Sequence, residues 1–514
     1  MAHHTAVFDA WHTACAYAVV VATSRASAPS WQAHQALRLQ ALLHDAALHS
    51  PLYRERLRAA GQGATAHETL QRLRPVHKRE LMQRFADWVT DPALALPALR
   101  AFVRERRNRG EAFAGRYLVW ESSGSSGEPA LFVQDERALA VADALEAARG
   151  PLSLAESGGW SDLFTGAGFE RIALVAATDG HFASVVAFER ARELNPWLGA
   201  ASHSFSFLQP IAHLVEQLNA FEPTVLASYP SMAWVLSEEQ RRGRLKIAPH
   251  ALWTGGETLT PATRRTLGER FHAPVRDNYG ASECFMIASE CRCGHLHLNA
   301  DWVILEPVDE QGRAAAPGEF GATTLLTNLA NHVQPVIRYD LGDRVRFMPG
   351  EDESPPTCRA SAGPPRGSRK LGSGPSFSCA CGSALPVIEV QGRADDVLTF
   401  EDAQGHEVHL APLALTTVLE DEAGVFDFQL CQGGPQALRL DVFGGGPHAA
   451  AAAALRKFLR EQGLGTTRVQ SHSASTEAER GRSGKQRRVV GDHAVAASHE
   501  TASRAKRAAA RARH

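Results

Sequence analysis

A short loop at residues 121–129 (ESSGSSGEP) has the residue types of a phosphate-binding loop, and it follows the strand-like run YLVW. Glycine and serine leave backbone N–H groups free to approach a phosphate closely, and serine hydroxyls supply further donors. The loop is not a Walker P-loop, because the G-x-x-x-x-G-K-[ST] spacing and its lysine are absent. A Ser/Gly loop taken alone is more often a linker, so its meaning depends on the segments that accompany it.

Further segments with chemically useful side chains follow this loop along the chain. They are WTGGETL at 253–259, NYGASE at 278–283, IRYDLGDRV at 337–345, GRADD at 392–396 and GRSGKQRR at 481–488. Each segment alone has an ordinary structural explanation, such as a turn, a helix cap, a surface ion pair or a solvated basic patch. Their joint occurrence in this order is a much more specific signal.

The elements that must position these segments alternate between strand-like and helix-length runs from about residue 117 to 345. Such alternation is typical of an α/β fold with largely parallel sheets. The strand-like runs are 117–120, 172–176, 224–228, 251–253 and 275–278. Runs at 426–431 and 438–443 then precede an Ala-rich helix at 448–463, which predicts a smaller α+β unit.

Changes in composition divide the chain. Pro, Gly and Ser make up 17 of the 30 residues from 349 to 378, which predicts a flexible insertion because so little apolar surface is available for burial. We expect a large domain with mixed or parallel sheets and helices at 1–393 and a small α+β domain at 394–490. The basic, Ala-rich tail at 491–514 is expected to be disordered.

The overall composition excludes several classes of protein. With 54 Lys and Arg against 56 Asp and Glu among 514 residues, no single sign of charge favours nucleic acid or a membrane surface. No apolar run reaches the roughly 18–20 residues of a membrane span. The run at 14–22 lacks the basic residues that precede a signal-peptide core, so we expect a helix packed on the body. The eight cysteines are too sparse for a disulfide scaffold, and the chain is expected to be cytoplasmic.

The ordered segments resemble the adenylate-forming superfamily of acyl- and aryl-CoA synthetases, adenylation domains and luciferases. The segment SPLYRERL, the GGE motif and the C-x-C-G stretch are most similar to the phenylacetate–CoA ligase-like branch. The resemblance spans about residues 35–490 without the insertion. It implies a small C-terminal domain that rotates between two half-reactions.

The resemblance implies a role for individual residues. The ATP phosphates would lie against Ser122, Ser123, Gly124, Ser125, Ser126 and Gly127, although Glu128 stands where a lysine is frequent. The adenosine would contact Gly255, Gly256, Glu257, Asn278, Tyr279, Gly280, Ala281, Ser282 and Asp343, with Arg393 at the ribose or phosphate. Glu283 would hold Mg²⁺, and Asp395 would be the hinge. Lys485 would stabilise the charge that develops as the substrate carboxylate attacks the α-phosphate.

The implied function is an ATP-dependent ligase that forms an acyl- or aryl-adenylate and passes the acyl group to CoA. The branch favours aromatic acids. Transfer to an amine or to a carrier protein is the nearest alternative, and a non-catalytic nucleotide-binding scaffold is a more distant one. The oligomeric state is not determined by the sequence, and a homodimer stays open.

The cysteines predict a second, structural site. Thiolates and imidazoles in a set of four suit tetrahedral Zn²⁺, and the branch often has Cys-rich segments at these two places. The preferred ligands are Cys291, His297, Cys379 and Cys381, with Cys293 as the substitute. Reduced, buried thiols without metal are the alternative. A catalytic zinc is not expected, because such ligands would fill a closed site.

Overall fold

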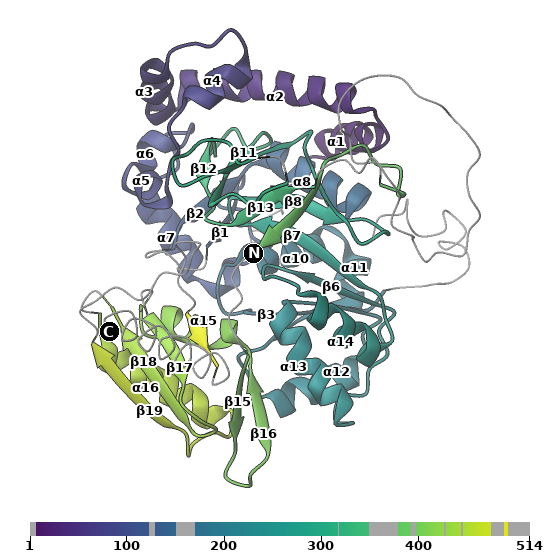
Figure 1. Cartoon of the computed structure of the whole chain (residues 1–514), viewed down its shortest axis with the longest axis vertical. Coiled ribbons are helices and arrows are strands. Elements are labelled where there is room, and N and C mark those ends of the chain that lie inside the picture. The colour runs from purple at the N-terminus through teal and green to yellow at the C-terminus, as the bar shows by residue number, and fades with distance from the viewer. Residues whose placement is uncertain are drawn as a thin grey trace, which may run out of the picture.

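The computed structural model describes residues 7–122, 129–150, 170–316, 318–348, 379–391, 397–425, 428–443, 446–473 and 488–491. These residues form the mixed α/β architecture that the sequence predicts, with helices around sheets that have parallel and antiparallel strands (Figure 1). The expected insertion at 349–378 and the tail from 492 lie outside the described residues.

Helices at the start of the chain cover one end of the body, purple to blue in Figure 1. They are α1 (Ala10–Ser24), α2 (Ala28–His49), α3 (Pro51–Ala60), α4 (Ala66–Arg72), α5 (Lys78–Gln83), α6 (Phe85–Trp88), α7 (Leu96–Arg104) and the 3-10 turn η1 (Arg106–Asn108). Proline in the first turn favours the starts of α2 and α3, because it lacks the N–H that would be unpaired there.

A buried ion pair fixes α1 and the helix α8 (Glu136–Arg149) to the body. Asp301 is fully buried and accepts hydrogen bonds from the Thr23 hydroxyl at 2.7 Å and from Arg149 at 2.7 and 2.9 Å. Val20 of α1 packs with Val141 of α8 in a small apolar cluster. The N-terminal segment is therefore packed on the body, as expected.

A nine-stranded sheet forms the centre of the body, with the order β13-β14-β9-β8-β7-β6-β5-β3-β4. Its parallel half contains β3 (Ile172–Ala176), β4 (Ser202–Ser206), β5 (Val225–Ser228), β6 (Ala251–Gly255) and β7 (Val275–Ala281). The helices on this half are α10 (Ala183–Leu194), α11 (Pro196–Ala201), α12 (Ile211–Phe221), α13 (Pro230–Arg241) and α14 (Pro261–Phe271). Helical connections are expected here, because parallel neighbours need a crossover.

The other half of this sheet is antiparallel, so the sheet is mixed, which is one of the two arrangements expected from the sequence. It contains β8 (Cys284–Glu290), β9 (Leu296–Leu298), β13 (Arg344–Phe347) and β14 (Val387–Gln391). Smaller sheets lie beside it. They are the pair β1 (Leu118–Glu121) and β2 (Leu131–Gln134), and the sheet of β10 (Val303–Val308), β11 (Thr323–Asn328) and β12 (Tyr339–Asp340).

The C-terminal elements form a separate group, yellow-green at the lower left of Figure 1. They are β15 (Leu398–Glu401), β16 (Glu407–Leu410), α15 (Pro412–Asp421), β17 (Phe428–Gln432), β18 (Ala437–Val442), α16 (His448–Glu461), β19 (Arg468–Ser473) and β20 (Val489–Val490). The last strands form a sheet of order β19-β18-β17-β20.

Contacts between the body and the C-terminal group are both apolar and polar. One core cluster includes Leu252 and Leu267 of the body together with Leu415 and Phe428. Arg242, at the end of α13, donates a 2.8 Å hydrogen bond to Glu407 of β16. Within the described residues, no helix combines the length and apolar character that crossing a membrane requires.

Candidate functional site

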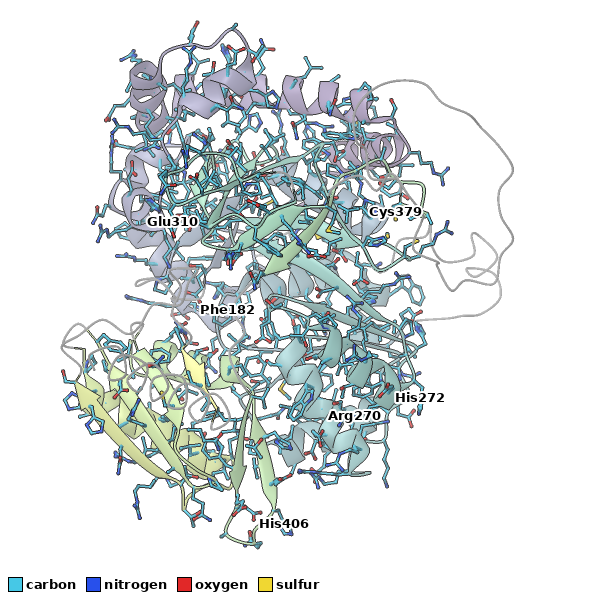
Figure 2. All side chains as sticks on the ribbon, in the orientation of Figure 1. Phe182, Arg270, His272, Glu310, Cys379 and His406 are labelled. Carbon is cyan, nitrogen blue, oxygen red and sulfur yellow. The ribbon has the colours of Figure 1, made fainter. Side chains whose placement is uncertain are left out.

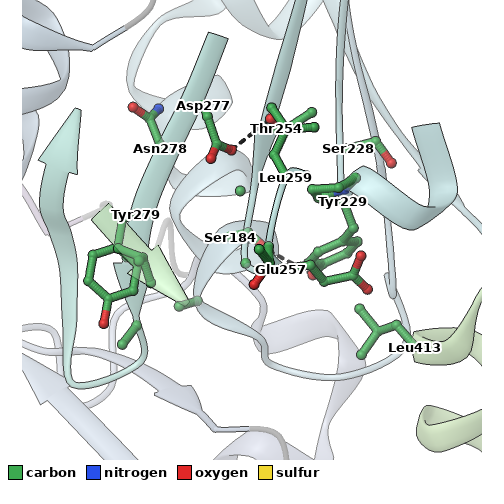
Figure 3. A pocket seen from close by; sticks show the side chains of 18 of the residues that line it. Ser184, Ser228, Tyr229, Thr254, Glu257, Leu259, Asp277, Asn278, Tyr279 and Leu413 are labelled. Carbon is green, nitrogen blue, oxygen red and sulfur yellow. Dashed lines mark hydrogen bonds between the residues drawn. The ribbon is translucent and has the colours of Figure 1, made fainter. Parts of the chain in front are cut away.

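A cavity of about 2910 Å³ opens where the strands β3, β5, β6 and β7 end. In open α/β sheets, ligands bind beyond the carboxyl ends of the parallel strands. Leu413 of α15 faces the body across this cavity (Figure 3). The sequence-predicted residues that line the cavity are Ser122, Gly255, Gly256, Glu257, Asn278, Tyr279, Gly280, Ala281, Ser282, Glu283 and Asp343.

The turn after β6 brings the backbone against an aromatic ring. Gly256 has a φ of 77°, a backbone conformation that residues with a Cβ atom disfavour. A Cβ atom added there would lie 2.9 Å from Cε1 of Tyr229. The Tyr229 hydroxyl is in turn 3.5 Å from Oγ of Ser184, at the start of α10 (Figure 3). Glycine therefore allows the turn and the tyrosine ring to share one wall of the cavity.

Glu257 has a positioning contact of its own. Its carboxylate accepts hydrogen bonds of 2.9 Å from both the backbone N–H and the hydroxyl of Ser231. Ser231 lies in the first turn of α13, where a negative charge is favoured by the free N–H groups of the helix end. The GGE turn is thereby connected to the start of α13.

The hairpin of β7 and β8 supplies the next part of the wall. Among the described residues, the Asn278 side-chain oxygen is buried without a hydrogen-bond partner, which is unusual in a folded protein. Tyr279 donates a 3.0 Å hydrogen bond to Asp343, and burial followed by the Asp343 charge raises the pKa of this tyrosine. The Cβ of an alanine at Gly280 would lie only 2.1 Å from the Phe285 carbonyl oxygen, so the hairpin requires glycine.

Glu283 lies in the turn between β7 and β8 and is half-buried. Burial raises the pKa of its carboxyl group, while a hydrogen bond from the side chain of Tyr339 and the positive charge of Lys78 lower it. A bound divalent cation would stabilise the charged carboxylate that burial disfavours. The carboxylate donor therefore fits the Mg²⁺ site that the sequence predicts.

Several predicted residues are not part of the described structure. Ser123, Gly124, Ser125, Ser126 and Gly127 of the loop lie outside the described residues. Arg393, Asp395 and Lys485 lie outside them as well. Ser122 is described, and it begins the loop with a hydroxyl that accepts a 3.0 Å hydrogen bond from the backbone N–H of Ala130.

The predicted zinc ligands come together from three segments of the chain. One ligand atom each from Cys291, His297, Cys379 and Cys381 lies within 4.8 Å of all the others. These are the four residues that the sequence analysis preferred. Cys379 is labelled in Figure 2, on the side of the body away from the C-terminal sheet. Cys293, the substitute, is not a member of this set.

Local hydrogen bonds orient these ligands. The Nδ1 of His297 is 2.9 Å from the Leu385 carbonyl oxygen, which leaves Nε2 to face Cys381 Sγ at 3.4 Å. A second partner that fixes the imidazole in this way is typical of metal-ligating histidines. Backbone N–H groups donate to Sγ of Cys291 and of Cys381, each at 3.4 Å. Donor types, spacing and orientation therefore fit a tetrahedral Zn²⁺.

The cavity also contains residues that the sequence analysis missed. Lys78 and Arg79 of α5 line it, although their segment resembles no binding motif. Asp277 accepts a 2.7 Å hydrogen bond from Thr254 (Figure 3), and burial raises its pKa to about 7. Glu146 of α8 lines it too. The signal that could have indicated Asp277 is its position directly before NYGASE.

Comparison with known proteins identifies the fold. No protein-family model matches the chain. Two solved structures of 2-hydroxyisobutyryl-CoA ligase are similar to it, one in the postadenylation state with R3-HIB-AMP and one in the thioesterification state with 2-HIB-AMP and CoA. Their TM-scores are 0.52 and 0.53 at 21% sequence identity. Each match covers 93% of this chain, and the matches cover 93% and 94% of the two ligase chains. The chain has the fold of the adenylate-forming CoA ligases.

A curated relative adds a shorter match. Protein CapK of Staphylococcus aureus is 25% identical over 166 residues, which is 32% of this chain and 34% of CapK. The chain thus matches about a third of that relative's length. The superfamily resemblance is confirmed at the level of the fold, and the phenylacetate–CoA ligase-like branch stays a prediction.

Proposed function

We propose that this protein is an ATP-dependent carboxylate-activating ligase that forms an acyl-adenylate and pyrophosphate, and then a CoA thioester. The observation that carries the proposal is the convergence of Asn278, Tyr279, Glu283 and Asp343 on one cavity at the carboxyl ends of parallel strands. The unpaired Asn278 side-chain oxygen supports a ligand there, because a buried acceptor without a partner destabilises the protein.

The nucleotide would bind along β7 and the turn after β6. One Asp343 carboxylate oxygen accepts a hydrogen bond from the Tyr279 hydroxyl. The same carboxylate would also accept hydrogen bonds from the ribose hydroxyls. Lys78 and Arg79 would contribute positive charge toward the phosphates, which compensates for Glu128 in the phosphate loop. Glu283 would hold Mg²⁺, and the metal would neutralise phosphate charge.

The substrate acid would lie on the other side of the phosphates. Phe182, Phe188 and Tyr229 line the cavity together with Ser184, and the three rings would favour an aromatic or extended apolar acid. A carboxylate oxygen would attack the α-phosphorus, forming an O–P bond as the bond to pyrophosphate breaks. The CoA thiolate would then attack the acyl carbon, forming the thioester as AMP leaves.

The first step would need little covalent help from the protein. Positioning and charge stabilisation carry this type of transfer, and Lys485 would supply charge at the α-phosphate. Arg393 would contact the ribose or phosphate, and the C-terminal group at 394–490 would rotate about Asp395 between the half-reactions. Such a rotation would replace the contacts that this group makes with the body, including the Arg242–Glu407 hydrogen bond and the shared apolar cluster.

Zinc would be structural. His297 lies in β9, and Cys379 and Cys381 precede β14, which pairs with β9 at Val387 and His297. A bound Zn²⁺ would therefore join strands that are distant in sequence and would contribute folding free energy. It would lie outside the adenylation chemistry.

The test is ATP–pyrophosphate exchange across a panel of carboxylic acids. Asp343→Asn should reduce exchange at least tenfold, because it removes charge from the acceptor of the ribose hydroxyls. Asp309→Asn, in an exposed turn between β10 and β11, is the matched control and should keep the parent rate. Absence of exchange with every acid would refute the proposal.

The acceptor needs a separate measurement. Acyl transfer from the adenylate should be compared with CoA, a panel of amines and a carrier protein. Thioester formation with CoA supports the proposal, whereas products with an amine or a carrier alone would establish the alternative ligase.

A further inference from the structure

The cavity continues from the acid-binding wall along α10. Ala183, Ala187 and Ala191 line it at a spacing of four residues, so they share one face of this helix. Leu139 and Ala142 of α8 contribute to the same wall. From Ser184 to Ala191 the helix advances about 10 Å, because each residue adds about 1.5 Å. The alanine side chains on this face of α10, and Ala142 on α8, leave room for a substrate.

An ion pair connects the two helices. Arg190 of α10 donates to both carboxylate oxygens of Asp143 in α8, each at 2.9 Å. The N–H group at Nε donates to the Val7 carbonyl oxygen at 2.9 Å. Arg190 is buried, and these bonds use three of the five N–H groups of its guanidinium. Arg190 is thereby held by Asp143, and its described hydrogen bonds include none to Glu146.

Glu146 lies one helical turn after Asp143 on the same face of α8 and lines the cavity. Within the described part of the chain, its carboxylate has no hydrogen bond or ion pair. Burial, and then the charge of Asp143, raise the pKa of Glu146 to about 7. The basic neighbour Arg149 is engaged by Asp301 and Ser24.

The surroundings of Glu146 favour a cation. Its position in the last turn of α8 places it near backbone carbonyls that carry partial negative charge. A neutral hydroxyl would donate a hydrogen bond but would leave the negative charge in place. A protonated amine would satisfy both the hydrogen bonds and the charge.

We infer that Glu146 determines substrate specificity by pairing with a protonated amine at the far end of the carboxylic acid. This inference rests on the proposed function. The length of the cavity wall along α10 favours an acid with several bonds between its carboxylate and its amine. The substrate class is therefore an extended amino-carboxylic acid, with either an alkyl or an aryl spacer.

The test compares matched acids in ATP–pyrophosphate exchange. The amine series contains 6-aminohexanoic and 4-(aminomethyl)phenylacetic acids, and the neutral series contains the isosteres heptanoic and 4-ethylphenylacetic acids. The variants are Glu146→Gln and, as a matched control, Glu136→Gln, which changes an exposed carboxylate on the same helix. Exchange is measured as kcat/KM for each acid.

We expect the parent and Glu136→Gln to prefer the amine of at least one pair by about ten- to a hundredfold, the range for a hydrogen bond to a charged group. Glu146→Gln should abolish this preference while keeping or improving exchange with the neutral isostere, which shows that the variant is folded. Equal use of amine and isostere by the parent would overturn the inference and leave the proposed function intact. A preference of Glu146→Gln for the amine equal to that of the parent would also overturn the inference and leave the proposed function intact. Absence of exchange with all acids would overturn both.

Discussion

Gly256→Ala tests how the turn after β6 shapes the acid-binding wall. Alanine at a φ of 77° costs about 1–2 kcal/mol, because the left-handed conformation brings Cβ close to the backbone. The new Cβ would also lie 2.9 and 3.1 Å from Cε1 and Cδ1 of Tyr229, where carbon atoms normally rest about 3.5–4.0 Å apart. Displacing a packed ring typically costs a further 1–3 kcal/mol or so. The free energy of unfolding should therefore fall by about 2–5 kcal/mol.

Gly243→Ala provides the matched control. Gly243 has a φ of 73°, close to that of Gly256, but a Cβ there meets nothing within 4 Å. This variant should lose only the backbone contribution of about 1–2 kcal/mol. Denaturant unfolding of both variants measures the difference. In pyrophosphate exchange, only Gly256→Ala should raise the KM for the acid, by about tenfold for each 1.4 kcal/mol lost in binding.

A second substitution isolates the ring contact. Tyr229→Ala removes the atoms that the new Cβ would meet, so Gly256→Ala in that background should cost no more than Gly243→Ala does. Equal losses for Gly256→Ala and Gly243→Ala in the parent background would refute the reasoning. So would a penalty for Gly256→Ala that persists in full without the ring.

Three further predictions concern the metal, the lysine and the insertion. Purified protein should contain about one zinc per chain by elemental analysis, and Cys379→Ser should lower both zinc content and melting temperature. Cys293→Ser should change neither, because Cys293 is outside the set of four. Lys485→Ala should slow adenylation by about 10²–10³-fold but spare thioester formation from a synthetic acyl-adenylate, and equal loss in both steps would contradict this role. Deleting residues 354–374 should leave adenylation within about a few-fold of the parent, whereas normal ATP binding without activation of any acid would contradict it.

A mixed or parallel sheet and the positions of its parallel strands could be predicted from the sequence, but the strand partners in the antiparallel half could not. The runs at 172–176 and 251–253 match β3 and β6 closely, because short apolar strands between helical segments are a local signal. In contrast, β14 pairs with β9 although about 90 residues separate Val387 from His297. Local periodicity contains no information about such a partner. The two C-x-C pairs do indicate that these distant segments meet, because Cys291 and Cys379 must lie close together to bind the same metal ion.

The candidate site shows the same division between local and distant information. Tyr279 and Asp343 were predicted from separate motifs, and their 3.0 Å hydrogen bond is a consequence of folding that neither motif describes. Glu146 was missed because a glutamate in an Ala-rich helix is normally a solvated residue. The role of Glu146 depends on Arg190, which lies 44 positions later and bonds to Asp143 and the Val7 carbonyl instead of to Glu146. A motif can therefore predict which reaction the cavity supports. The choice of acid depends on charges that only packing brings together, and for that reason the pairing of Glu146 with a substrate amine has to be inferred from the structure.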